Sequence, residues 1–194
     1  SKNKTNTSYR ELFKTILYAL LIAFGIRTFA YEPFSVPSTS MVPTLLVGDY
    51  FFVSKYSYGY SKYSFPLVMP LFSGRILNRP PQRGDVAVFK VPTDNKTDYV
   101  KRIVGIPGDR VQMIEGKLHI NGNLIIREIV KPSELIDLND SGFIYRETMP
   151  NGKSYLIRDL GLSFQDNTKE YLIRSGHYFM MGDNRDNSRD SRIE

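Results

Sequence analysis

Residues 98–106 read DYVKRIVGI, a short run rich in β-branched residues that predicts a strand. Between two further runs, Asn121-Gly122 is typical of a two-residue hairpin turn, because both residue types tolerate positive φ. The sequence therefore predicts a mainly β fold. The other runs of this kind, separated by Gly, Pro and Asn, are 49–56, 85–91, 109–114, 117–122, 123–129 and 171–182.

An apolar segment precedes the strands. Residues 12–31 number twenty, and at ~1.5 Å per residue a helix of that length spans a bilayer. Lys14 and Arg27 lie near its ends, where long side chains reach the interface. Most charged residues of the preceding segment 1–11 are basic, namely Lys2, Lys4 and Arg10, and this predicts a cytoplasmic N-terminus. We expect a single-pass anchor in the cytoplasmic (inner) membrane, with the rest of the chain on the extracytoplasmic (periplasmic) side. A cleavable secretory signal and a buried amphipathic helix are the alternatives.

The composition excludes several kinds of site. The chain of 194 residues has no cysteine, which rules out disulfides, thiol nucleophiles and cysteine metal ligands. Its net charge is +6, but the basic residues form no long run, so we expect no nucleic-acid partner. His119 and His177 are far apart in predicted strands, which gives poor support to a His-based triad or a metal-dependent hydrolase. We expect no metal and no cofactor.

A hydroxyl-rich turn follows the apolar segment. It reads PSTSMVPTL, residues 37–45, and is framed by two prolines. Proline fixes φ and restricts the residue before it, so such a frame holds a hydroxyl in one orientation. The pattern is also typical of an ordinary loop, and a serine becomes a nucleophile only beside a base.

Lys101 is the candidate base in the strand 98–106. A lysine base must be neutral, so its surroundings must lower its pKa from ~10.4 toward ~7–8, at a cost of roughly 3–5 kcal/mol. Burial among apolar groups has this effect. The side chains of Lys101 and Arg102 point to opposite faces of the strand, so both face water only if neither face is buried. Exposure of Lys101 on an edge strand is the alternative.

A dense polar loop ends the chain. An apolar run passes into GDNRDNSRDSR, residues 182–192, whose Asp, Asn and Ser side chains favour turns. A calcium loop is an alternative, although the EF-hand spacing and its terminal Glu are missing. We interpret the loop as polar groups that orient the base.

Four blocks in this order resemble the bacterial type I signal peptidases (leader peptidases), a serine–lysine peptidase family. They are PSTSMVPTL at 37–45, RGDVAVFK at 83–90, YVKRIVGIPGD at 99–109 and GDNRDNSRDSR at 182–192. The resemblance implies a catalytic β core with a smaller β subdomain and an N-terminal transmembrane helix. It also implies a membrane-bound serine endopeptidase that removes N-terminal signal peptides from exported preproteins, cutting after small residues in Ala-X-Ala.

The resemblance implies roles for single residues. Ser40 matches the nucleophile and Lys101 the general base. Ser38 matches a hydroxyl of the oxyanion hole, beside the Ser40 N–H, and Ser188 matches a hydroxyl that orients the lysine. The residues that match supporting positions are Asp183 and Asn184, with Asp190 and Arg192 as a structural ion pair.

The family's substrates bind as extended segments, so β-augmentation is the expected mode of binding. Small-residue specificity requires shallow apolar pockets. An anchor that holds the enzyme at the bilayer surface raises the effective concentration of signal peptides. We expect signal peptides and the lipid bilayer as partners and a monomeric protein. The candidate pocket residues are Phe34, Val36, Met41, Leu45, Tyr99 and Val100.

The expected division places a catalytic core at 32–114 and 175–194, with a smaller β-rich subdomain at 115–174. The aromatic, proline-containing segment 57–82 fits a loop at the bilayer interface and a packed surface loop equally well. Because relatives of this family continue with further strands, we expect that the chain, which stops at Glu194, lacks part of the fold.

Two other functions compete with the signal peptidase. One is a related serine–lysine peptidase with another substrate, such as a self-cleaving regulator. The other is a membrane-tethered, non-catalytic β-domain that binds exported proteins. Retention of every matched catalytic position argues against the second.

Overall fold

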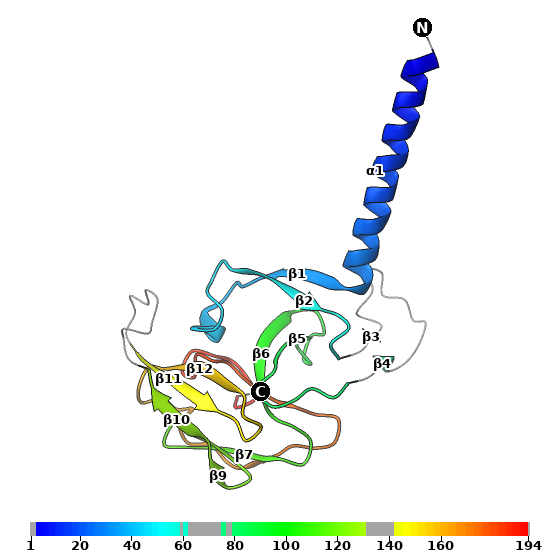
Figure 1. Ribbon diagram of the computed structural model, residues 1–194. Coiled ribbons are helices and arrows are strands. Elements are labelled where there is room, and N and C mark those ends of the chain that lie inside the picture. The colour runs from blue at the N-terminus through cyan, green and yellow to red at the C-terminus, as the bar shows by residue number, and fades with distance from the viewer. Residues whose placement is uncertain (1–2, 59, 62–74, 77–78, 131–141, 194) are drawn as a thin grey trace. The chain divides into compact units, whose positions relative to one another are not determined.

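The computed structural model describes residues 3–58, 60–61, 75–76, 79–130 and 142–193 (Figure 1). It begins with one long helix, α1 (Asn3–Phe29), on which large apolar side chains from Leu12 to Ile26 are exposed. None of the helices in these residues combines the length and the apolar character that a membrane crossing requires.

The bounds of α1 differ from those of the predicted anchor, residues 12–31. It begins at Asn3 and ends at Phe29, and strand β1 (Tyr31–Ser35) starts at Tyr31. Pro33 lies inside β1 and has no N–H to donate, which disfavours a helix there and is tolerated in a two-stranded sheet.

Residues 1–34 and 50–80 form one compact unit. Besides α1, it contains the pair β1 and β2 (Tyr50–Ser54) and the pair β3 (Tyr60–Ser61) and β4 (Arg75–Ile76). The Phe34 ring stacks on Phe51 of β2 at a centroid distance of 6.1 Å. Most of segment 57–82 lies outside the described residues, so neither a loop at the bilayer interface nor a packed surface loop is tested for it.

Residues 35–49 and 81–194 form the second unit, which contains three antiparallel sheets. The first has the order β14 (Phe179–Met181), β6 (Asp98–Gly105) and β5 (Val86–Lys90). The second has the order β13 (Tyr171–Leu172), β7 (Arg110–Ile114), β8 (Lys117–Ile120) and β9 (Asn123–Leu124). The third has the order β10 (Ile126–Ile129), β11 (Phe143–Thr148) and β12 (Ser154–Asp159). This unit thus holds both the predicted catalytic core from residue 81 onward and the predicted insertion.

The core of the second unit joins its three sheets. Val104 of β6, Leu118 of β8, Ile157 of β12 and Met181 of β14 have fully buried side chains in one cluster. Burial of each side chain contributes ~1.5–3 kcal/mol. Because β6 and β14 share this core with the insertion strands, the sheet that carries Lys101 has a rigid support.

The structure confirms the mainly β prediction and the hairpin turn, at which Asn121 and Gly122 have φ of 55° and 78°. The run 123–129 divides at buried Ile125 into β9 and β10, which belong to different sheets. The run 171–182 also divides into two strands. Strands β1, β11 and β12 were not predicted individually, because their sequences lack a continuous apolar run.

Candidate active site

The loop around Ser40 is held in a fixed conformation. Thr39–Met41 form a single 3-10 turn in which Ser40 and Met41 are buried. Asn184 donates its backbone N–H to the Ser40 carbonyl at 3.1 Å and its side-chain amide to the Thr39 carbonyl at 3.1 Å. Asn187 donates to the Thr39 hydroxyl at 2.9 Å. The loop 182–192 therefore fixes the backbone that carries the Ser40 hydroxyl.

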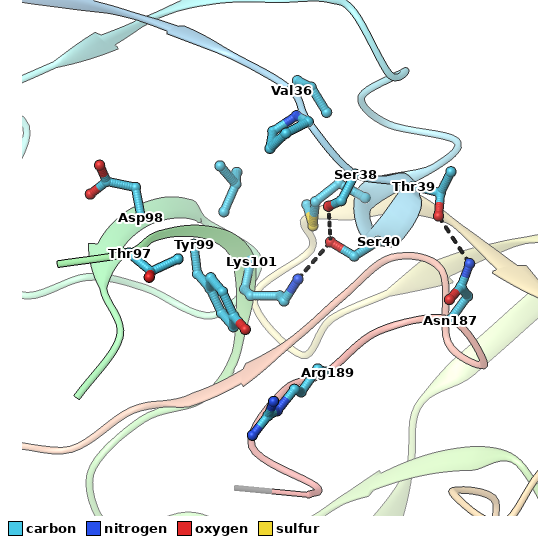
Figure 2. A pocket seen from close by; sticks show the side chains of 13 residues that line it. Val36, Ser38, Thr39, Ser40, Thr97, Asp98, Tyr99, Lys101, Asn187 and Arg189 are labelled. Atoms are coloured by element: carbon cyan, nitrogen blue, oxygen red, sulfur yellow. Dashed lines mark hydrogen bonds between the residues drawn. The ribbon is translucent and has the colours of Figure 1, made fainter. Parts of the chain in front are cut away.

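Lys101 lies on β6, the central strand of its sheet, and its side chain points toward Ser40 (Figure 2). Its Nζ donates to Ser40 Oγ at 2.6 Å, and the two residues are only 4% and 8% exposed. The Nζ also lies 5.2 Å from the centre of the Tyr99 ring. The alternative of an exposed Lys101 on an edge strand is therefore wrong.

Both predicted accessory hydroxyls lie at this site, in different environments. Ser38 Oγ is 3.2 Å from Ser40 Oγ (Figure 2). Ser188 is buried, and its hydroxyl has no hydrogen-bond partner of good geometry among the described residues. It lies near Asp190 and helps to lower the pKa of that carboxyl. The hydrogen bond from Ser188 to Lys101 that the resemblance implies is thus not formed here.

A cavity of about 310 Å³ opens beside the Ser40–Lys101 pair. Its wall consists of residues 36–41, residues 97–101, Asn187 and Arg189. Four of the six predicted pocket residues line it, namely Val36, Met41, Tyr99 and Val100. Leu45 is not among the lining residues, and Phe34 belongs to the first unit, where it packs on Phe51.

Arg102 and Asp183 form a buried ion pair next to the dyad. Arg102 donates from Nε at 2.7 Å and from Nη2 at 2.6 Å to the Asp183 carboxylate, which also accepts from the Thr44 hydroxyl at 2.5 Å. The guanidinium lies 4.0 Å from the centre of the Tyr155 ring. Both Lys101 and Arg102 are thus buried on opposite faces of β6. Sequence reasoning gave no role to Arg102, although an arginine inside an apolar strand is a signal for such a pair.

Asp190 and Arg192 form the expected ion pair. Arg192 Nε and Nη2 donate to the two Asp190 oxygens at 2.9 and 2.8 Å. Burial opposes the charged form of Asp190, but the hydrogen bonds and the charge of Arg192 outweigh it, so the pKa of this carboxyl lies below its usual value. The Asp190 carboxylate also accepts from the Gly182 N–H at 3.0 Å, which ties the two ends of the loop together.

Gly182 leaves no room for a side chain. A Cβ at this position lies 2.5 Å from the Ser40 carbonyl oxygen and 2.5 Å from Ser188 Cβ, and it also meets Ser188 Oγ. These distances are shorter than any normal contact, so a larger residue must displace the Ser40 loop or Ser188.

We therefore expect Gly182→Ala to lower kcat by ~10²-fold, because a displacement of ~1 Å at a reacting group has that effect. Steady-state kinetics of peptide cleavage measures it. Gly25→Ala is the control, because a Cβ at Gly25 meets nothing within 4 Å. Unchanged kcat in a folded Gly182→Ala protein would show that the loop adapts without loss of geometry.

The two histidines take no part in this site. His119 Nδ1 lies 3.1 Å from the Lys117 carbonyl within its hairpin, and His177 Nδ1 lies 3.0 Å from the Ser175 carbonyl. Lys101, whose Nζ donates to Ser40 Oγ, is therefore the candidate base.

Sequence comparisons identify related proteins. The profile of the family described as "Signal peptidase, peptidase S26" matches residues 9–193. Signal peptidase I of Rickettsia typhi (strain ATCC VR-144 / Wilmington) is 40% identical over 202 residues, which cover 98% of this chain and 75% of its own. Signal peptidase I of Rickettsia massiliae (strain Mtu5) is 40% identical over 205 residues, which cover 100% of this chain and 76% of its own.

A crystal structure of a signal peptidase I from Enterococcus faecalis V583 is 24% identical in sequence, covers 59% of this chain and 86% of its own, and superposes with a TM-score of 0.34. The family assignment rests on the sequence matches, which extend over nearly the whole chain. The chain therefore belongs to the signal peptidase family, peptidase S26, and is an endopeptidase of that family.

Proposed function

We propose that this endopeptidase removes N-terminal signal peptides from exported preproteins by means of a Ser40–Lys101 dyad. The observation that carries the proposal is the 2.6 Å hydrogen bond between Lys101 Nζ and Ser40 Oγ, which joins two buried residues 61 positions apart. A hydroxyl and an amine in such contact are the elements of a serine–lysine peptidase.

In the proposed reaction, neutral Lys101 takes the proton of the Ser40 hydroxyl as Oγ attacks the scissile carbonyl. A tetrahedral oxyanion forms, and protonated Lys101 then gives the proton to the leaving amine. The signal peptide stays bound to Ser40 as an ester. Lys101 next removes a proton from water, whose oxygen attacks the ester carbonyl. As the ester bond breaks, Lys101 gives this proton to Ser40 Oγ, and the signal peptide leaves with a free carboxyl group.

The Ser38 hydroxyl and the Ser40 N–H are the proposed donors to the oxyanion. Ser38 Oγ lies 3.2 Å from Ser40 Oγ, close to where the substrate carbonyl must sit. A donor of this kind contributes ~10²–10³ in rate. We also propose that Ser188 supports the loop beside Ser40, because its buried side chain and the Ser40 carbonyl both lie against Gly182.

The cavity beside the dyad supports a preference for small residues before the cleaved bond. Val36, Met41, Tyr99 and Val100 contribute apolar surface to its lining. We propose that this lining accepts Ala at the position before the cleaved bond. The partial burial of Tyr99 and Val100 on β6 supports an extended substrate laid along that strand.

We further propose that the protein acts as a monomer at the cytoplasmic membrane, with its N-terminus in the cytoplasm and the catalytic part on the extracytoplasmic side. Exposed apolar side chains along α1 support contact with lipid. Ser40, Lys101, Ser38 and Ser188 all come from one chain, which supports activity without a second copy.

The test is cleavage of a preprotein with an Ala-X-Ala site in liposomes. We expect a single cut after the second Ala and a loss of ~10²-fold or more when that Ala is replaced by Phe, in line with the Ala-X-Ala specificity that the family resemblance implies. N-terminal sequencing of the product gives the position. Equal cleavage of both substrates would contradict the small-residue specificity.

A further inference from the structure

Glu147 on β11 is a fully buried carboxylate that reaches the loop 182–192. It is 0% exposed and accepts two hydrogen bonds from Arg185, from Nη1 at 2.8 Å and from Nη2 at 2.6 Å. The Tyr155 hydroxyl on β12 donates to the same carboxylate at 3.0 Å. Arg185 is itself only 3% exposed. Strand β11 thus binds Arg185 of the loop through a bidentate pair, and Tyr155 on β12 hydrogen-bonds the same carboxylate.

The backbone of the same loop segment pairs with β12. Arg158 donates its N–H to the Asp183 carbonyl at 2.8 Å, and Arg185 donates its N–H to the Arg158 carbonyl at 2.8 Å. Arg192 Nη2 donates to the Arg185 carbonyl at 2.7 Å. Residues 183–185 are therefore held from both sides, and the Glu147–Arg185 pair is the side-chain part of this attachment.

Residues 183–185 in turn hold both members of the dyad. Asn184 donates its N–H to the Ser40 carbonyl at 3.1 Å, and Asp183 binds Arg102, the neighbour of Lys101 on β6. We therefore expect a displacement of segment 183–185 to change the distance between Ser40 Oγ and Lys101 Nζ.

We infer that Glu147 is a positioning residue for the Ser40–Lys101 dyad, which it holds in register through Arg185 and the backbone of residues 183–185. The inference rests on the proposed function of the dyad. A buried ion pair adds little net stability over an apolar pair of equal volume. Its bidentate geometry, however, fixes the orientation of the arginine, and hence of the backbone that carries it.

The first test compares Glu147→Gln with Asp109→Asn. Asp109 is also buried and accepts a bidentate pair, from Arg83 at 2.7 and 2.5 Å, but its other contacts are with Ile106 and Asn121, away from the dyad. We expect Glu147→Gln to lower kcat by ~10–100-fold with KM changed less than about threefold, because geometry at the dyad is lost while the cavity wall is kept. Asp109→Asn should keep kcat per folded molecule. Equal losses of kcat in both variants would overturn the inference.

Hydrogen exchange gives a readout that does not depend on activity. In Glu147→Gln, the amides of residues 183–185 should exchange at least ~10-fold faster than in the wild type, whereas those of β6 keep their rates. Asp109→Asn should leave the exchange of residues 183–185 unchanged. Unaltered exchange of this segment in Glu147→Gln would contradict the inference.

A triple variant separates positioning from stability. Glu147→Met, Tyr155→Phe and Arg185→Met together remove every polar partner and leave an apolar cluster, so the thermal midpoint should stay near that of the wild type. We expect kcat at least ~10-fold lower. A stable triple variant with wild-type kcat would overturn the inference about Glu147 but not the proposed dyad. Cleavage by Ser40→Ala, in contrast, would contradict the dyad, and the hydrogen-exchange result would then decide whether Glu147 positions residues 183–185. If the triple variant does not fold, the Glu147→Gln comparison decides.

Discussion

Replacement of Ser40 by alanine should abolish preprotein cleavage, with kcat reduced by at least ~10⁴-fold, while the protein stays folded. The variant removes the atom that forms the bond to the substrate, and in serine peptidases loss of the nucleophile has an effect of this size or larger. Only one hydroxyl is lost, so the backbone contacts of the loop, such as the 3.1 Å bond from Asn184 to the Ser40 carbonyl, are kept.

Single-turnover cleavage of the Ala-X-Ala preprotein measures this loss, and the far-ultraviolet circular dichroism melt checks the fold. Ser154→Ala is the matched control, because Ser154 is exposed and its hydroxyl pairs only locally, with Thr148 at 2.9 Å. Turnover by Ser40→Ala above ~1% of the wild-type rate would remove Ser40 from the mechanism and require another nucleophile.

Replacement of Lys101 by methionine should also inactivate the enzyme, by ~10³-fold or more, because methionine has a similar length but cannot accept a proton. The stability of the fold should be kept or increased, since the change removes a charge-bearing group from a site that is 4% exposed. Lys101→Arg should be inactive as well, because a guanidinium does not lose its proton near neutral pH.

The pH dependence separates a base from a structural lysine. A general base works in its neutral form, so the wild-type rate should fall as the pH is lowered through the pKa of the base, and the residual rate of Lys101→Met should lack this limb. Lys153→Met is the control, because Lys153 forms a partly exposed pair with Asp85, worth only ~0–1 kcal/mol. Wild-type activity in Lys101→Met would exclude the lysine base.

Much of the local structure follows from the sequence. Runs of β-branched and aromatic residues identify β2, β5, β6, β7 and β8, because strand formation depends on neighbouring residues that fit a pleated surface. The hairpin at Asn121-Gly122 follows from the conformational freedom of two adjacent residues. The resemblance of four motifs to a known family singles out Ser40 and Lys101, whereas residue type and spacing alone left an ordinary loop and an exposed lysine as alternatives.

The tertiary structure alone decided how these residues meet. Ser40 and Lys101 are 61 positions apart, Arg102 and Asp183 are 81 apart, and Glu147 and Arg185 are 38 apart. Each contact depends on which strands pack together, and a linear pattern does not contain that information. The same holds for Gly182, whose lack of a side chain matters because the Ser40 carbonyl and Ser188 lie against it. The sequence thus determined the local elements and the chemical groups, whereas burial and long-range packing determined which groups became partners.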